Sequence, residues 1–347
     1  MLCQPTFCSI KVVKPTLGFT LWRHQYSSQE RRSASCIETF AIIAAMGKRG
    51  YDFKTGSAMP IVSENDAQFI DQLNATMGAA MATITARGQT IHDIDAYRYL
   101  MDQLLPMQMP TDVPMADVAQ WHPHMELADG VTAAVAIPHG DGPFPVLVHA
   151  HGHGLMAGHS HEFEPWIRTL ASYGFVVVFP DYSHMPEAPY EQLIDEMQIA
   201  IDWLCSHGAA IRADPARMVL GGDSAGGGLA FDLLLRNLAR EDGARFRAFE
   251  GMDGNVDGQI MARKGHASLL DQLTQDTKLP PMILVVGTAD FTFPAHLRMA
   301  TRLNELKKHF EWHVYHGMPH DFAKFPKMEI AQTANRRMMT FLQRACE

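Results

Sequence analysis

A five-residue segment in the second half of the chain has the residue types and spacing of an activated serine. Gly222-Asp223-Ser224-Ala225-Gly226 has the form G-x-S-x-G and lies between a short apolar run and a segment with helical character. Glycines on both sides permit the sharp strand-to-helix turn that exposes a serine hydroxyl. We therefore interpret Ser224 as a nucleophile and Ala225 as a backbone donor to the developing oxyanion. The alternative is a glycine-rich turn with an incidental serine.

A second glycine-rich segment, His151-Gly152-His153-Gly154, follows an apolar run that ends at His149. Acyl transfer requires donors aimed at the position of the oxyanion, and backbone N–H groups in such a loop supply them without moving. One donor is worth roughly two to three orders of magnitude in rate. We assign Gly152 and His153 as backbone donors, and His151 and Gly154 as supporting residues of the motif.

The same loop lies within a dense group of histidines, which comprises His149, His151, His153, His159 and His161. The pattern H-x-H after a strand is a common arrangement of metal ligands, so a metal-dependent hydrolase is an alternative. The sequence offers no well-placed pair of carboxylates to complete a two-metal site. We therefore predict no metal and no cofactor, and we interpret His159 and His161 as loop histidines without a role.

A serine hydroxyl is a weak nucleophile until a base removes its proton. Asp290 follows an apolar run at 281–286, and His320 lies between a later strand and the last helix. The order serine, acid, histidine along the chain is that of one large class of serine hydrolases. We predict His320 as the general base and Asp290 as the residue that orients it. Three neighbours are interpreted as loop, turn or structural residues: Asp253, Asp257 and His316.

These side chains need alternating strands and helices to bring them together. Apolar runs predict buried strands at 131–137, 145–149, 175–179, 218–220, 281–286 and 312–315. Amphipathic patterns predict helices at 63–105, 166–173, 190–205, 226–238, 295–309 and 328–343, and prolines mark 106–114 as a connector. The alternation indicates an α/β fold with a mostly parallel sheet. Active sites of such sheets lie at the carboxyl ends of the strands, where the predicted site residues fall.

The composition is that of a globular chain, and it restricts the class of partner. The 347 residues are 47% hydrophobic and carry a formal net charge of -9, which disfavours nucleic acid and an anionic membrane surface. The five cysteines are widely spaced, so we expect no disulfide framework, no structural zinc site and a reducing, cytoplasmic compartment. The apolar run at 40–46 is too short to span a membrane, so no stable insertion is expected.

Five motifs in order resemble those of the hormone-sensitive-lipase-like esterases of the α/β-hydrolase fold. They are the oxyanion segment 151–154, Asp181-Tyr182 with Pro186-Glu187, the serine segment 222–226, the acid segment 287–290, and His320-Asp321-Phe322. The similarity covers roughly residues 60–345. It implies an eight-stranded sheet with a helical cap built partly from residues 63–105. It also implies hydrolysis of short-chain acyl esters through a covalent acyl-enzyme, with a small-molecule ester as partner and no cofactor.

Two departures from the family pattern concern the choice of substrate. His153 stands where the oxyanion motif has glycine, and its side chain is expected to narrow the acyl pocket. The stretch from Ser224 to Asp290 is short and lacks the usual strand that ends in a Ser-Pro-like turn, which residues 246–254 are expected to replace. The triad does not choose between esters and amides, so an amidase or peptidase is an alternative. A non-catalytic ligand-binding member of the fold is another.

The chain divides by composition into three parts. Residues 1–45 are basic and serine-rich, and we interpret them as a disordered or non-native extension, with a transit peptide as the alternative. Residues 46–115 are expected to form an N-terminal helical cap segment, and residues 116–347 the catalytic domain. The sequence leaves open whether the chain forms a homodimer.

Overall fold

The computed structural model describes residues 10–11, 62–254 and 268–347. The predicted extension at 1–45 lies outside these residues, except for Ile10–Lys11, which form the short strand β1. The same holds for Asp257.

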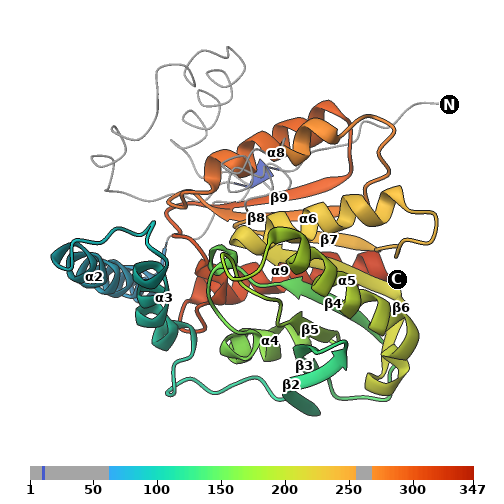
Figure 1. The fold of residues 1–347 in the computed structure, drawn as a ribbon, viewed down its shortest axis with the longest axis horizontal. Helices are drawn as coiled ribbons and strands as arrows, with labels where there is room; N and C mark the ends of the chain where they lie inside the picture. The colour runs from blue at the N-terminus through green and yellow to red at the C-terminus, as the bar shows by residue number, and fades with distance from the viewer. Residues whose placement is uncertain (1–9, 12–61, 255–267) are drawn as a thin grey trace.

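The chain folds around one twisted sheet with helices packed on both of its faces (Figure 1). Within the described residues its order is β1-β9-β8-β7-β6-β4-β5-β3-β2. Strand β3 is antiparallel to both β2 and β5, and the other neighbours are parallel. Strands β2–β9 make the eight-stranded, mostly parallel sheet that was predicted, and β1 adds two residues at the edge beside β9. The strands are β2 Gln120–Ala128, β3 Val131–Ile137, β4 Phe144–Ala150, β5 Val176–Pro180, β6 Ala213–Asp223, β7 Ala248–Met252, β8 Met282–Gly287 and β9 Phe310–Tyr315.

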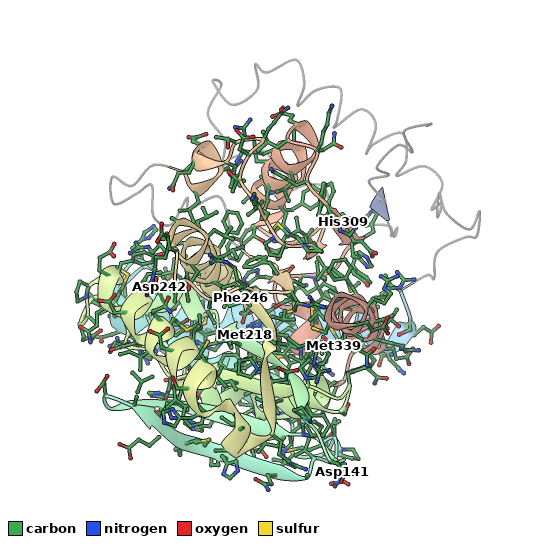
Figure 2. All side chains as sticks on the ribbon, turned by 90° about the vertical axis from the view of Figure 1, so that its right-hand side faces the viewer. Asp141, Met218, Asp242, Phe246, His309 and Met339 are labelled. Carbon is green, nitrogen blue, oxygen red and sulfur yellow. The ribbon has the colours of Figure 1, made fainter. Side chains whose placement is uncertain are left out.

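The central strands are apolar on both faces because helices cover both faces. Val146 and Val148 of β4 pack into one core cluster, whereas Leu147 between them packs into the other. The first cluster lies under α5 Tyr190–His207, α6 Ser224–Ala239 and α8 Phe293–Glu305, and the second under α4 Glu164–Ala171 and α9 Glu329–Cys346. Figure 2 shows side chains filling these layers; Met218 and Met339 are both buried.

The predicted helix at 63–105 is two helices, α2 Glu64–Ala86 and α3 Ile94–Gln108. Gly88 adopts a φ of +69° just after the last residues of α2, which ends the helix there. The side chain of Asp93 then accepts a hydrogen bond from the Thr90 N–H at 2.7 Å, just before α3 begins. The proposed connector at 106–114 is also shorter than predicted, because Pro106 lies inside the last turn of α3.

Two strands, β2 and β7, were not predicted from apolar runs. Strand β2 is exposed along much of its length, so it lacks an apolar run. Strand β7 occupies the segment 246–254 that was expected to replace a missing strand, and it is fully buried between β6 and β8. Glu250 interrupts the apolar residues of β7, so the segment does not form the continuous apolar run that predicts a buried strand.

Within the described ranges, no helix has both the length and the apolar character needed to cross a bilayer. Of the cysteines in these ranges, Cys205 is exposed and Cys346 is buried, and both are free thiols.

Candidate active site

Ser224 occupies the sharp turn between β6 and α6 that its flanking glycines permit. Its φ is +51°, a left-handed value that costs energy for a residue with a Cβ. A Cβ added to Gly222 would lie 2.5 Å from the Gly226 carbonyl oxygen, and one added to Gly226 would overlap with the carbonyl of Ala150. The two glycines therefore let the elbow fold tightly against the end of β4.

The structure brings Ser224, His320 and Asp290 into one hydrogen-bonded row. The Ser224 Oγ and His320 Nε2 atoms are 2.9 Å apart, and His320 Nδ1 is 2.9 Å from Asp290 Oδ2. Asp290 is fully buried just after β8, and its other oxygen accepts a hydrogen bond from the Thr292 N–H at 2.7 Å. The row has the arrangement in which an imidazole can take a proton from a serine hydroxyl.

The electrostatics of the row favour a charged imidazole. Burial by itself lowers the pKa of His320, but the nearby carboxylates of Asp290 and Asp321 more than offset it and bring this pKa to about 9. Burial also acts to raise the pKa of Asp290, and the charge and hydrogen bond of His320 reverse this and hold it below its usual value. Asp290 is therefore an anion that can stabilise the imidazolium once His320 accepts a proton.

The predicted oxyanion loop lies beside the serine, at the end of β4. His153, Gly154 and Leu155 have φ values of 59°, 67° and 62°, so the backbone makes a tight left-handed turn here. A Cβ added to Gly152 would lie 2.8 Å from the Ser224 Cβ, which shows how closely the loop approaches the elbow. Ala225, the third predicted donor, is buried in the first turn of α6.

The supporting residues of the oxyanion motif pack inside the loop. The His151 ring stacks on Tyr182 at a centroid distance of 4.4 Å, and the Tyr182 hydroxyl donates to the His151 carbonyl. A Cβ on Gly154 would lie 2.7 Å from the hydroxyl oxygen of Tyr97 on α3. Tyr182 belongs to the Asp181-Tyr182 motif, so both this motif and α3 pack against the oxyanion loop.

The histidines near this loop point to different environments. His149 is buried between two carboxylates, His151 stacks on Tyr182, and the Nε2 atom of His153 is 3.5 Å from the Gln108 side-chain nitrogen. His159 and His161 lie farther along, and their rings stack on each other at 5.8 Å. Across the ranges that the structure describes, no three His, Cys, Asp or Glu side chains form a group that could hold a metal ion. The arrangement therefore gives the metal alternative no support.

Sequence reasoning missed a buried ionic network under the elbow. His149 lies 3.0 Å from Glu250 of β7 and 3.0 Å from Asp223, and the Lys324 ammonium donates to the other Asp223 oxygen at 2.6 Å. Burial opposes charge on His149, but Glu250 and Asp223 raise its pKa to about 9. Charged residues in otherwise apolar segments, Glu250 within β7 and Lys324 after His320-Asp321-Phe322, were the available signal.

Asp253 lies in the turn just after β7, as interpreted from the sequence, but its contacts with the site were not foreseen. Its carboxyl group is fully buried beside Asp290, where it accepts hydrogen bonds from the Gly287 N–H at 3.3 Å and the Asp321 N–H at 3.1 Å. Burial and the negative charge of Asp290 raise the pKa of Asp253 well above its usual value, so of the two carboxyl groups Asp253 is the one that more readily holds a proton. His316, in contrast, contacts Thr288 at 3.3 Å, as expected of a structural residue.

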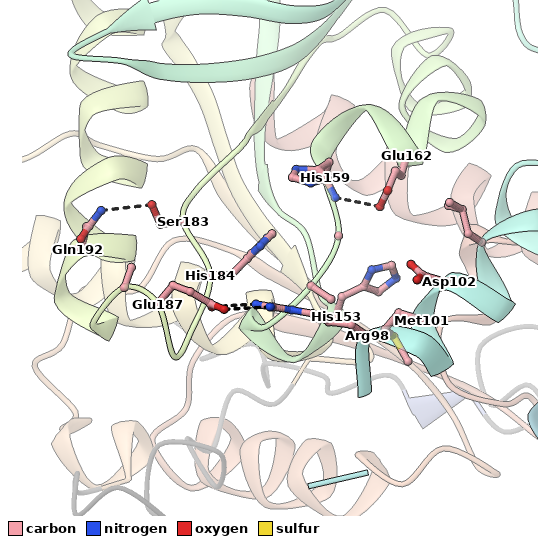
Figure 3. Close-up of a pocket in the computed structure, with 14 residues that line it drawn as sticks. Arg98, Met101, Asp102, His153, His159, Glu162, Ser183, His184, Glu187 and Gln192 are labelled. Atoms are coloured by element: carbon pink, nitrogen blue, oxygen red, sulfur yellow. Dashed lines mark hydrogen bonds and ion pairs between the residues drawn. The ribbon is translucent and has the colours of Figure 1, made fainter. Parts of the chain in front are cut away.

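A cavity of about 630 Å³ opens on the far side of the oxyanion loop (Figure 3). Its walls come from α3, from the loop around His153 and from the segment after Tyr182. Arg98 of α3 spans one wall and forms two hydrogen bonds with Glu187, at 2.9 and 2.8 Å. The lining mixes apolar side chains such as Met101 and Leu105 with charged and polar ones, so the cavity can hold a group that has both apolar and hydrogen-bonding parts.

Comparison with known protein families and curated sequences agrees with the motifs. Residues 147–262 match a family model described as alpha/beta hydrolase fold. The chain is 38% identical over 95 residues to human hormone-sensitive lipase, a match that covers 27% of this chain and 9% of the lipase. It is 36% identical over 100 residues to the carboxylesterase NlhH of Mycobacterium tuberculosis, covering 28% of this chain and 31% of that protein. The chain thus covers less than a third of the length of these curated relatives.

Solved structures extend the likeness to most of the fold. A bacterial heroin esterase superposes with a TM-score of 0.64 at 21% identity, over 79% of this chain and 98% of that one. An esterase from the bacterial hormone-sensitive lipase family superposes with a TM-score of 0.62 at 22% identity, over 79% and 99% of the two chains. At these identities the likeness establishes a shared fold.

Proposed function

We propose that the chain is a serine hydrolase that cleaves short-chain carboxylic esters through an acyl-enzyme. The premise is its α/β-hydrolase fold, together with the resemblance to hormone-sensitive-lipase-like esterases that its motifs predicted. One observation supports the proposal above all others. Two contacts of 2.9 Å join the Ser224 hydroxyl, the His320 imidazole and the Asp290 carboxylate at one edge of the sheet.

The proposed cycle assigns one role to each of these groups. His320 takes the Ser224 proton while Oγ attacks the ester carbonyl, and it then protonates the departing alcohol. A water molecule that gives its proton to the same imidazole attacks the acyl-enzyme and releases the acid. Asp290 holds Nδ1–H of the ring, which keeps Nε2 directed at the serine and stabilises the imidazolium.

The backbone N–H groups of Gly152, His153 and Ala225 are proposed to bind the oxyanion. The left-handed turn at His153 and its neighbours supports this, because successive N–H groups in such turns make concave sites for anions. These donors belong to a loop that Tyr182 and Tyr97 pack against, so they would need little reorganisation during the reaction.

Helices α2 and α3 are proposed to form the cap over this site. Arg98 of α3 donates to the Met156 carbonyl at 2.9 Å, which ties the cap to the oxyanion loop. The cavity beside His153 would then receive the part of the ester that extends past the oxyanion loop. His153 lines this cavity, and its side chain is proposed to narrow the acyl pocket, which would favour small acyl groups.

A fluorophosphonate probe tests the nucleophile directly. We expect stoichiometric labelling of wild-type protein at Ser224 and none of Ser224→Ala, whose rate of p-nitrophenyl acetate hydrolysis should fall by about 10⁴-fold or more. Ser206→Ala is the matched control, since Ser206 lies on the exposed end of α5 and should not affect labelling. Labelling that persists in Ser224→Ala, or a wild-type protein that never reacts, would contradict the proposal and favour a ligand-binding role.

Acyl preference is tested with p-nitrophenyl esters of increasing chain length. We expect kcat/KM to be highest for acetate or butyrate and to fall for longer chains. Faster turnover of long chains would reject the short-chain preference without affecting the serine mechanism. Anilide analogues of the best ester separate an esterase from an amidase or peptidase. Chelator treatment should leave the rate unchanged, whereas a metal-dependent hydrolase would lose activity.

We also propose a small-molecule ester as the partner and a reducing, cytoplasmic location. The free thiols of Cys205 and Cys346 and the acidic net charge are in keeping with both. Cell fractionation with an antibody against the chain tests the location, and sedimentation tests whether a homodimer forms.

A further inference from the structure

A second carboxylate lies beside the proposed base, on the side that faces the serine. The Asp321 Oδ1 atom is 3.7 Å from His320 Nε2, the same nitrogen that contacts Ser224. This oxygen is buried and has no hydrogen-bond partner within the described parts of the chain. Asp321 also has a φ of +61°, in the left-handed region that favours glycine. An unpaired carboxylate oxygen so close to Nε2 can compete with the serine for the proton on that nitrogen.

The other oxygen of this carboxylate is held by a buried lysine. Lys324 Nζ is 2.8 Å from Asp321 Oδ2 and donates to Asp223 Oδ2 at 2.6 Å. The lysine side chain is 1% exposed, so water cannot screen either contact effectively. Asp223 precedes Ser224 in the elbow. Lys324 therefore links the carboxylate beside the base to the turn that carries the nucleophile.

We propose that Asp321 and Lys324 are positioning residues of the proposed reaction, and that together they set the basicity of His320 and its alignment with Ser224. Asp321 favours the protonated imidazole that forms when the serine attacks. Lys324 holds Asp321 through Oδ2 and offsets part of its negative charge. The His320 Nε2 atom therefore keeps its contact with the Ser224 hydroxyl and can release its proton to the leaving group. The proposal rests on the proposed esterase function and assigns the pair a role in it.

The other titratable groups around His320 are either neutral or needed to orient its ring, so the Asp321–Lys324 pair is the one to alter in a test. The charged or titratable side chains that face the ring are Asp290, Asp321, Lys324, His153 and His296. Burial lowers the pKa of His153 to about 3 and that of His296 to about 4, so both are neutral above pH 5. Asp290 is needed to orient the ring. Among the described residues that face the ring, Asp321 and Lys324 therefore carry the charges that can be removed without removing an assigned catalytic group.

Two substitutions are expected to move the His320 titration in opposite directions. Asp321→Asn removes the carboxylate and fits the left-handed backbone, because Asn tolerates this region well. It should lower the pKa of His320 by about one unit. Lys324→Met leaves the Asp321 charge unopposed and should raise the pKa of His320 by a similar amount. In the double variant the two effects should largely cancel.

The pKa of His320 is measured by NMR titration of histidine-labelled protein, and the pH dependence of kcat/KM is measured in parallel with p-nitrophenyl acetate. The acid limb of the profile of kcat/KM against pH, which reports the pKa of His320, should move to lower pH in Asp321→Asn and to higher pH in Lys324→Met. Lys327→Met is the matched control, since it breaks a neighbouring but exposed pair, 2.8 Å from Asp112, and should leave the limb unchanged. A purely structural role would lower the rate at every pH without moving the limb.

The outcomes separate this proposal from the proposed function. If wild-type protein hydrolyses no ester but the NMR titrations shift as expected, the esterase proposal fails while the electrostatic role of the pair stands. If the protein is an active esterase and Asp321→Asn leaves the His320 titration where it was, the pair has no such role. Should Lys324→Met fail to fold, Asp321→Asn alone still decides the question, because Lys324 keeps its contact with Asp223 there.

Discussion

At the residue scale, the site depends on backbone conformations that few residue types tolerate. Ser224 has a left-handed φ, and the chain around it folds back so tightly that Gly226 lies against the end of β4. Such strain is held only where the surroundings determine it strongly. In this protein the adjacent glycines and the packed loop 151–154 provide those surroundings.

We expect Gly226→Ala to destabilise the protein by about 2–4 kcal/mol, because the new Cβ overlaps with the backbone carbonyls of Ala150 and His151. Gly78→Ala is the matched control: Gly78 lies within α2, and a Cβ there meets nothing within 4 Å. That substitution should increase stability by about 0.5–1 kcal/mol. Urea unfolding measures both changes. Equal effects of the two substitutions would contradict the tight packing of the elbow.

A second prediction at the residue scale concerns the effect of substitutions at Asp253 on stability. Asp253→Asn keeps an uncharged group that can donate to Asp290, and it should lower the free energy of unfolding by about 1 kcal/mol. Asp253→Ala leaves the N–H groups of Gly287 and Asp321 without an acceptor, and it should lower the free energy of unfolding by about 3 kcal/mol. Because burial raises the pKa of Asp253, its stabilising effect is full below pH 3.8 and declines as the pH rises through the folded value. The stability gap between wild type and Asp253→Asn should therefore narrow between pH 4 and pH 7 in urea titrations.

At the scale of elements, the ionic network connects three neighbouring strands beneath the nucleophile. His149 lies next to the end of β4, Asp223 ends β6 and Glu250 lies in β7. The contact of His149 with Asp223 joins adjacent strands, and its contact with Glu250 reaches past β6 to β7. Hydrogen-bonded charges of this kind are costly to break singly, because the partner is left buried and uncompensated. The network therefore supports the relative placement of the oxyanion loop and the elbow.

The network should make stability depend on pH in the alkaline range. Since the pKa of His149 is raised from 6.5 to about 9, its contribution is full below pH 6.5 and is lost as the pH rises through 9. The stability difference between wild type and His149→Gln should shrink by about 3 kcal/mol between pH 6 and pH 9.5. Urea midpoints of both proteins at the two pH values measure it. A difference that stays constant would mean that His149 is neutral in the folded protein.

At the scale of the whole molecule, the N-terminal helices are joined to the last helix of the fold. The Asp66 carboxylate of α2 accepts hydrogen bonds from the Glu329 and Ile330 N–H groups at 2.7 and 3.1 Å, so it caps α9 from another part of the chain. Phe69 of α2 packs on Phe325 at a centroid distance of 5.1 Å. Figure 1 shows α2 and α3 together at one end of the sheet, where these contacts hold them.

We expect Asp66→Ala to cost about 1–2 kcal/mol and to loosen α2 and α3 before the sheet opens, because a lost N-cap leaves two N–H groups unpaired. Hydrogen exchange measured by mass spectrometry should show faster exchange over 64–108 with little change in β4–β8. Glu64→Ala, in the same turn of α2 but exposed, serves as the control. Uniform acceleration over the whole chain would mean that the helices and the sheet unfold together.

The sequence alone determined the features that depend on local chemistry. A nucleophile elbow requires glycines next to its serine, buried strands require apolar runs, and both could be found without knowing which strands pair. The α/β-hydrolase fold and the family resemblance followed from such segments in order. The spacing also proposed Ser224, Asp290 and His320 as one group; their adjacency is seen in the structure, and their catalytic roles stay predictions.

Only the tertiary structure decided which polar groups meet across the sheet. His149 and Glu250 are separated by 101 positions, and so are Asp223 and Lys324, so no local pattern links them. Asp253 lies in the turn after β7, as its local sequence indicates, but only the pairing of β7 with β8 places it against Asp290. Buried charges are stable only with partners, and those partners are chosen by strand order and packing, because hydrophobic patterns specify which face of an element is buried but not which element lies opposite.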